Sequence, residues 1–186
     1  VDDIPAIWPV DAPGNGRAWV EENVTAGKAV NAAIHASLSL PEMDPERLVI
    51  QRLEGSYDYQ DLTIHYLRPM PPITGINGSA TFDAEKMTFS VEEGNVGEIA
   101  SGPATVVLFD FEEDLQRADI AFAPSAPLGA VLDLLNHPRL RLIEDLGLDP
   151  ATVSGNATAE VTMGFPLDDE LTFDGVDVKA EGRPSE

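Results

Sequence analysis

The sequence contains no cysteine and few basic residues, and each shortage excludes a class of function. Without cysteine the chain has no disulfide framework, no thiolate metal site and no cysteine nucleophile. Its 11 lysines and arginines stand against 33 aspartates and glutamates, which gives a formal net charge of −22. Basic surfaces bind nucleic acids and anionic lipid headgroups, so neither is expected as a direct partner. The acidity by itself indicates solubility and a salty or extracellular surrounding.

Long apolar runs are also missing. No segment approaches the roughly 18 consecutive apolar residues that a membrane-spanning helix needs. The chain opens on Val1-Asp2-Asp3 without an initiating methionine or a signal peptide, and we interpret it as a segment of a larger protein. With 43% hydrophobic residues over 186 positions, the segment has enough apolar material for one folded domain.

The sequence is rich in alternating apolar and polar residues, the pattern of strands with one apolar face. The alternation runs from 30 to 40 and resumes at 48, and its phase slips by one residue at Arg52, which predicts a β-bulge. The strands at 76–82 and 87–91 form the clearest hairpin. Further strands are expected at 62–66, 95–100, 104–111, 115–123 and 153–165.

Short helices interrupt the strands. Asn15 can cap a helix that runs to about Thr25, with Gly27 as its stop. A stripe of apolar residues at 128–135 predicts a second helix, and residues 142–146 suggest a third. The sequence therefore predicts a mainly β protein with two or three short helices.

The end of the chain matches an earlier part of it. The alternation of 32–40 ends on Pro41, and that of 157–165 ends on Pro166. Any two amphipathic strands alternate alike, so chance similarity is the alternative to a true repeat. We divide the one β-rich segment, 1–186, into four parts. They are an irregular start and a helix (1–27), strands (28–123), a helical insert (125–147) and the start of a second repeat-like unit (151–182).

No motif of nucleophile, nucleotide or metal chemistry is present. The three histidines, His35, His65 and His137, are not in metal-ligand spacing. Acidic clusters such as Glu92-Glu93 fit turn and edge charges that discourage pairing of sheet edges. We therefore expect no enzyme, no metal site and no cofactor. A hydrolase would need a pocket in which His65 or His35 meets a serine and a carboxylate.

The apolar strand faces are long and mix small with bulky residues, and the few helices cannot cover them. Either two sheets pack face to face in a closed sandwich, or one curved sheet leaves an apolar trough. Such a trough would bind something elongated and apolar. Strand parity gives the residues that would line it: Ile34, Leu38, Ile64, Phe82, Phe89, Val161 and Met163.

A segment rich in proline and glycine leads into the hairpin, and nothing in it is chemically reactive. Its prolines set a turn, and its glycines allow close approach of the backbone or a ligand. We expect a structural corner formed by Tyr66, Pro71, Pro72, Gly75 and Gly78.

Four motifs together carry a family resemblance. They are an early Trp8-Pro9; Arg17-Ala18-Trp19-Val20-Glu21-Glu22-Asn23 followed by Gly27; Tyr66-x4-Pro71-Pro72-x2-Gly75-x2-Gly78-x-Ala80-x-Phe82-Asp83; and Gly155-x-Ala157-x-Ala159 with Phe165-Pro166-Leu167. In this combination the chain resembles the AsmA-like superfamily, and within it the periplasmic region of the YhdP-like branch of Gram-negative bacteria. None of these motifs is catalytic.

That resemblance implies a repeating β-groove, with neighbouring repeats in the same chain and a parent protein anchored in the inner membrane. It implies a periplasmic, non-enzymatic segment that binds or conducts phospholipid acyl chains towards the outer membrane. The alternative function is a structural or interaction module of the cell envelope with a fully packed core. The family supplies no active-site residues to carry over.

Overall fold

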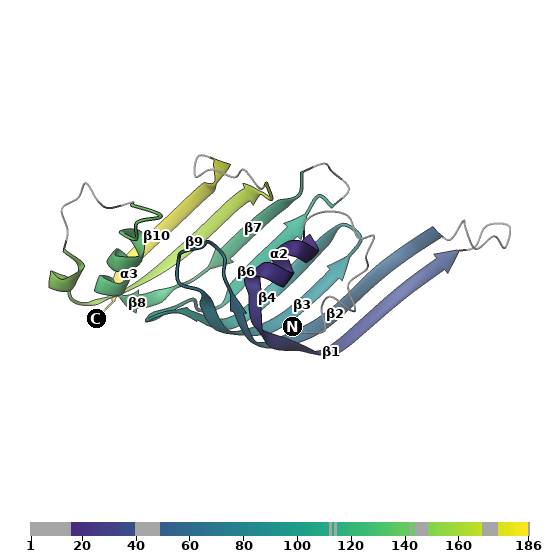
Figure 1. The fold of residues 1–186 in the computed structure, drawn as a ribbon, viewed down its shortest axis with the longest axis horizontal. Coiled ribbons are helices and arrows are strands. Elements are labelled where there is room, and N and C mark those ends of the chain that lie inside the picture. Colours follow the sequence, from purple (N-terminus) through teal and green to yellow (C-terminus); the bar gives the residue numbers. More distant parts are fainter. Residues whose placement is uncertain are drawn as a thin grey trace.

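The computed structural model describes residues 16–39, 49–111, 113, 115–141, 143, 149–168 and 175–185. Within these residues all strands belong to one antiparallel sheet (Figure 1). The strands are β1 (Val24–Ser39), β2 (Val49–Ile64), β3 (Ile73–Asp83), β4 (Lys86–Val96), β5 (Ile99–Ala100), β6 (Ala104–Phe109), β7 (Arg117–Phe122), β8 (Ser125–Pro127), β9 (Asn156–Pro166) and β10 (Asp177–Ser185). The helices are α2 (Gly16–Asn23), α3 (Leu128–Leu135) and the single 3-10 turn η4 (Pro150–Thr152).

The sheet follows the chain from one side to the other. β1, β2, β3 and β4 pair in sequence order. β4 then pairs with β6 along its first half and with the short β5 near its end. In the same way β9 pairs with β7 and with the short β8, and β10 lies outside β9. The prediction of a mainly β protein with one long antiparallel sheet is confirmed. The closed two-sheet sandwich is wrong for the described part of the chain.

β1 bends sharply along its length, as Figure 1 shows. Its pairing with β2 changes register between Val30 and Ala33, where Asn31 has a positive φ of 55°. Left-handed backbone at a register shift is the geometry of a bulge, which bends a strand and increases its twist. These irregularities curve the sheet at its β1–β2 side.

The bulge predicted from the phase slip at Arg52 is confirmed. Ser37 pairs with Arg52, whereas Leu38 pairs with Ile50. Gln51 is therefore the extra residue on β2. Because of this extra residue, the apolar positions before and after it lie on the same face of the sheet.

Several predicted boundaries are wrong. Helix α2 ends at Asn23, whose side-chain amide donates to the carbonyl of Trp19 at 3.0 Å. The β-branched residues that follow favour a strand, so β1 starts at Val24, inside the part proposed as 1–27. Gly27 ends no helix, since it lies within β1 with a φ of 112°.

The C-terminal divisions also differ from those predicted. Helix α3 confirms the predicted helix at 128–135, but the proposed insert 125–147 begins with strand β8. The helix predicted at 142–146 falls mainly outside the described residues. The unit proposed to begin at 151 is a β9–β10 hairpin that continues to Ser185, beyond the predicted end at 182.

The predicted hairpin is confirmed as β3–β4, and the side chain of Asp83 fixes its turn. Phe82 pairs with Met87, and one carboxylate oxygen of Asp83 accepts from the backbone N–H groups of Glu85 at 2.8 Å and Lys86 at 2.9 Å. These two bonds hold the pKa of Asp83 below its ordinary value, because they favour the charged carboxylate. An aspartate side chain that accepts hydrogen bonds from the backbone of the next residues is typical of a tight turn, and Asp83 has this role here.

The buried core is small for a chain of this length. It centres on Tyr59, Ile76 and Ala80, where β2, β3 and β4 lie side by side. Among the described residues, α2 makes its main contacts with β1, and α3 makes its main contacts with β8 and η4. No helix in the described part of the chain is long and apolar enough to cross a membrane.

Candidate functional site

One face of the sheet consists of three unbroken rows of apolar residues, each row joining cross-strand partners. The first row is Ile34, Gly55, Phe82, Met87, Leu108, Ala118 and Phe165. The second row is Tyr57, Ala80, Phe89, Val106, Ile120, Met163 and Val178. The third row is Tyr59, Gly78, Val91, Ala104, Phe122, Val161 and Ala180. We call this surface the apolar face.

The opposite surface, which we call the polar face, carries the intervening residues. Two of its rows show the contrast. One is His35, Glu54, Asp83, Lys86, Phe109, Arg117 and Pro166; another is Asp58, Ser79, Ser90, Thr105, Ala121, Thr162 and Lys179. An antiparallel sheet with one wet face normally packs its other face on a core. Here the described strands supply no second sheet for the apolar face.

The apolar face is open to solvent most clearly at its two sides. Ile34 is 66% exposed and Leu38 is 55% exposed on β1, and Val178 is 46% exposed on β10. Between them most bulky residues of the three rows are half-buried, and Tyr59, Ala80 and Ala118 are buried. A contiguous apolar surface of this kind marks a site of interaction with another apolar body.

The structure brings together the residues predicted from strand parity. Five of them lie in the three rows: Ile34, Phe82, Phe89, Val161 and Met163. Leu38 lies further along β1 with the parity of Ile34, and Ile64 packs against the core cluster. The predicted set omits the middle strands β6 and β7. Their alternation gave the same signal in the sequence, through residues such as Val106 and Ile120.

Tyr59 is the most buried aromatic residue of the apolar face. Its hydroxyl donates to the carbonyl of Ser90 at 3.0 Å, and its ring lies 6.5 Å from that of Tyr57 and 6.4 Å from that of Phe89. Burial, with smaller contributions from Tyr57 and Glu92, raises the pKa of the Tyr59 hydroxyl to about 12. This hydroxyl therefore stays neutral, as a residue of an apolar surface should.

The predicted corner lies between β2 and β3, next to this cluster. Tyr66 is partly exposed, and burial of its ring raises its pKa. Gly75 has a φ of 62°, and Gly78 lies so close to Tyr59 and Ser90 that a Cβ would collide with both. The remaining corner residues, Pro71 and Pro72, lie in the irregular segment just before β3.

An arginine ties the corner to helix α2. Arg68 donates to the side-chain oxygen of Asn23 at 2.6 Å and to the carbonyl of Glu22 at 3.1 Å. Asn23 is buried, and its carbonyl accepts from the backbone N–H of His65 at 2.8 Å. The end of α2 and the start of the corner therefore form one hydrogen-bonded unit beside β1.

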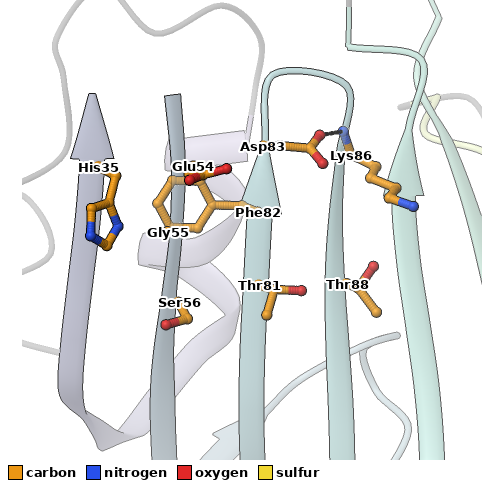
Figure 2. Close-up of a pocket in the computed structure, with 9 residues that line it drawn as sticks. All are labelled: His35, Glu54, Gly55, Ser56, Thr81, Phe82, Asp83, Lys86 and Thr88. Atoms are coloured by element: carbon orange, nitrogen blue, oxygen red, sulfur yellow. Dashed lines mark hydrogen bonds between the residues drawn. The ribbon is translucent and has the colours of Figure 1, made fainter. Parts of the chain in front are cut away.

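A hollow of about 330 Å³ lies near one end of β1–β4 (Figure 2). His35, Glu54 and Ser56 line it, together with Gly55, Thr81, Phe82, Asp83, Lys86 and Thr88. No hydrogen bond joins His35 to Glu54 or Ser56, although all three line the hollow. His65 belongs to the corner rather than to this hollow.

A second hollow, of about 540 Å³, opens where β6 and β7 end and β5 and β8 take over their pairing. It is lined by Val91, Ala104, Phe122 and Val161 of the third apolar row, together with Ser90, Pro103, Thr105, Ala121, Ala123, Glu160 and Thr162. Its lining therefore combines residues of the apolar face with residues of the polar face, among them Ser90, Thr105 and Thr162.

Within the described residues, no group of three or more histidines, aspartates and glutamates could hold a metal ion. Comparison with protein-family models, with curated proteins and with solved structures gives no match for this chain.

Proposed function

We propose that this chain is a non-enzymatic periplasmic segment of an AsmA-like protein that binds or conducts phospholipid acyl chains on its apolar face. The observation that supports this function is the set of three apolar rows, which cross the sheet without a polar interruption and are exposed at both sides, at Ile34 and Val178. The resemblance in sequence motifs supplies the periplasm, the inner-membrane anchor of the parent protein and the phospholipid.

The dimensions of the face suit an acyl chain. Each row crosses seven strands, and six gaps of about 4.8 Å give a length of about 29 Å. One leaflet of a bilayer's hydrocarbon core is about 15 Å thick, half of the total of about 30 Å. A single row is therefore longer than one acyl chain, and adjacent rows offer space for the second chain of a phospholipid.

The energetics favour the acyl chain and not the headgroup as the bound part. Burying a methylene group stabilises the bound state by about 0.8 kcal/mol, so an acyl chain gains from each apolar contact along a row. The net charge of −22 repels anionic headgroups. We therefore place the headgroup in water at the border of the sheet and the acyl chain along the rows.

Native mass spectrometry of the purified chain, with extraction and identification of bound lipid, tests this function. The matched variants are Val161→Asp, on the third apolar row, and Thr162→Asp, the next residue on the polar face. We expect phospholipid on the parent chain and on Thr162→Asp, and its loss from Val161→Asp while the far-ultraviolet circular dichroism spectrum stays unchanged.

The competing function is an interaction module whose apolar face is packed against protein. It would be supported if no lipid is found on any variant and if Val161→Asp unfolds the chain while Thr162→Asp does not. That outcome would mean that the apolar rows are ordinary core.

A further inference from the structure

Two adjacent carboxylates, Glu92 and Glu93, lie in the interior of the sheet. Both belong to β4, which pairs with β3 on one side and with β5 and β6 on the other. The sequence predicted turn or edge charges at this place, which would discourage the pairing of sheet edges. That prediction is wrong for these two residues, because β4 has paired strands on both sides.

Glu93 has a hydrogen-bond partner on the neighbouring strand. It pairs with Asn77 of β3, whose side-chain amide donates to the Glu93 carboxylate at 2.9 Å. The side-chain oxygen of Asn77 accepts from the backbone N–H of Asp61 on β2 at 3.0 Å. Glu93 is therefore part of a hydrogen-bonded link between β2, β3 and β4.

Glu92 is the extra residue of a β-bulge. Gly78 pairs with Val91 whereas Asn77 pairs with Glu93, so Glu92 has no residue opposite it on β3. A bulge redirects the side chains around it, and bulges are common next to functional sites. Glu92 is exposed, and within the described residues its carboxylate has no hydrogen-bond or ion-pair partner. Its place in the structure is therefore not explained by a bond within the described chain.

Glu92 follows directly on the third row of the apolar face. Val91, the preceding residue, belongs to that row, whereas Gly94 is buried and a Cβ there would lie 3.3 Å from the side chain of Ile76. Burial is the main cause of the raised pKa of the Tyr59 hydroxyl, and the charge of Glu92 contributes to it. The carboxylate therefore lies within electrostatic reach of the third row, between that row and a buried part of β4.

The strands around Glu92 carry no basic residue that could neutralise it. β3, β5 and β6 contain neither lysine nor arginine. The basic residue of β4 is Lys86 at the opposite end of the strand, and the six positions from 86 to 92 span about 20 Å. Charges that are exposed and so far apart are screened by salt. The charge that complements Glu92 can therefore come from a bound ligand.

We propose that the phospholipid on the apolar face has a net-neutral headgroup with an ammonium group, and that Glu92 binds this ammonium group. The inference rests on the function proposed above and adds the class of headgroup. An anionic headgroup without an ammonium group would bring only its phosphate charge towards the Glu92 carboxylate, and the two negative charges would repel each other.

The third row leaves room for an acyl chain beside a headgroup at Glu92. From Val91 the row continues across β6, β7 and β9 to Ala180 on β10. These four strand spacings of about 4.8 Å give a length of about 19 Å. That length exceeds the thickness of about 15 Å that one leaflet contributes to the hydrocarbon core of a bilayer. The ammonium group and the acyl chain can therefore be bound at the same time.

Competition between two phospholipids with identical acyl chains tests the headgroup class. The 186-residue chain is mixed with equal amounts of a phosphatidylethanolamine and a phosphatidylglycerol in detergent micelles, and native mass spectrometry measures the ratio of the two bound lipids. We expect the parent chain to bind the ethanolamine lipid in preference. Glu92→Gln should reduce this ratio about two- to fivefold, which is the effect of one partly solvated ion pair.

Glu98→Gln is the matched control, because Glu98 is an exposed carboxylate in the turn between β4 and β5 and its substitution changes the net charge by the same amount. This variant should keep the ratio of the parent chain. If the parent chain binds both lipids equally, or if the two variants have the same ratio, the inference is wrong while the proposed function stands. If none of the three chains binds phospholipid, the proposed function fails and the inference fails with it.

Discussion

Small residues decide how the large side chains of the apolar face lie. Gly78 lets the ring of Tyr59 rest against β3, since a Cβ there would come within 2.6 Å of the Tyr59 hydroxyl oxygen and would collide with the carbonyl of Ser90. Gly55 gives the same room to the ring of Phe82. Aromatic rings that lie flat over glycine produce a low, continuous surface, whereas a bulky residue at either position would raise or displace a ring.

We therefore expect Gly78→Ala to destabilise the fold by about 1–3 kcal/mol, the usual cost of overpacking a filled site. Urea unfolding of parent and variant measures this difference. Gly182→Ala is the control, because its Cβ would meet only a carbonyl at 4.0 Å. Equal stability of the two variants would show that Tyr59 does not need the space over Gly78.

The raised pKa of Tyr59 gives a second prediction at this scale. The folded chain favours the neutral hydroxyl, so the stabilisation is complete below the unfolded-state pKa of about 10 and is lost as the pH rises towards about 12. We expect the free energy of unfolding to fall progressively across this range. Tyr59→Phe should have a smaller alkaline loss; an identical pH profile for both chains would contradict the assignment.

At the scale of elements, the alternation of apolar and polar residues predicted the long strands. It did not predict the backbone conformation at positions where contacts between strands determine it. The β3–β4 hairpin and the bulge at Arg52 were readable, because a period of two and its slip are local signals. The positive φ angles at Gly27 and Asn31 could not be predicted from the sequence, since they depend on how β1 bends against β2. Strands β5 and β8 span two and three residues, too few for any period to show.

The hydrogen-bonded unit of α2 and the corner is also an element-scale feature, and Arg68 tests it. Removing this side chain in Arg68→Ala leaves the oxygen of the buried Asn23 without its partner. We expect a loss of about 1–2 kcal/mol in the free energy of unfolding. Thermal or urea unfolding provides the measurement.

Arg52→Ala is the matched control for Arg68→Ala. Arg52 bonds the half-exposed Glu54 at 2.7 Å, and ion pairs at the surface contribute about 0–1 kcal/mol. If both substitutions have the same small effect, the corner does not depend on Arg68 for its stability.

At the scale of the whole molecule, the sequence determined which residues share a face but not whether anything covers that face. Parity placed Phe89 and Met163 among apolar residues, and the sheet pairing then put both in one row. The choice between a closed sandwich and an open sheet depends on which strands pair, and alternation is the same in both. The proposed repeat stays a prediction, because part of the matching sequence lies outside the described residues.

Residue-resolved photo-cross-linking tests most directly whether acyl chains lie along the apolar face. A phospholipid with a photoreactive diazirine on its acyl chain is mixed with the protein, irradiated and mapped by peptide fragmentation. We predict label on Val106 and Ile120 of the apolar face, competed by unlabelled phospholipid. Equal label on their polar-face neighbours Val107 and Ala121, or no competable label at all, would contradict it.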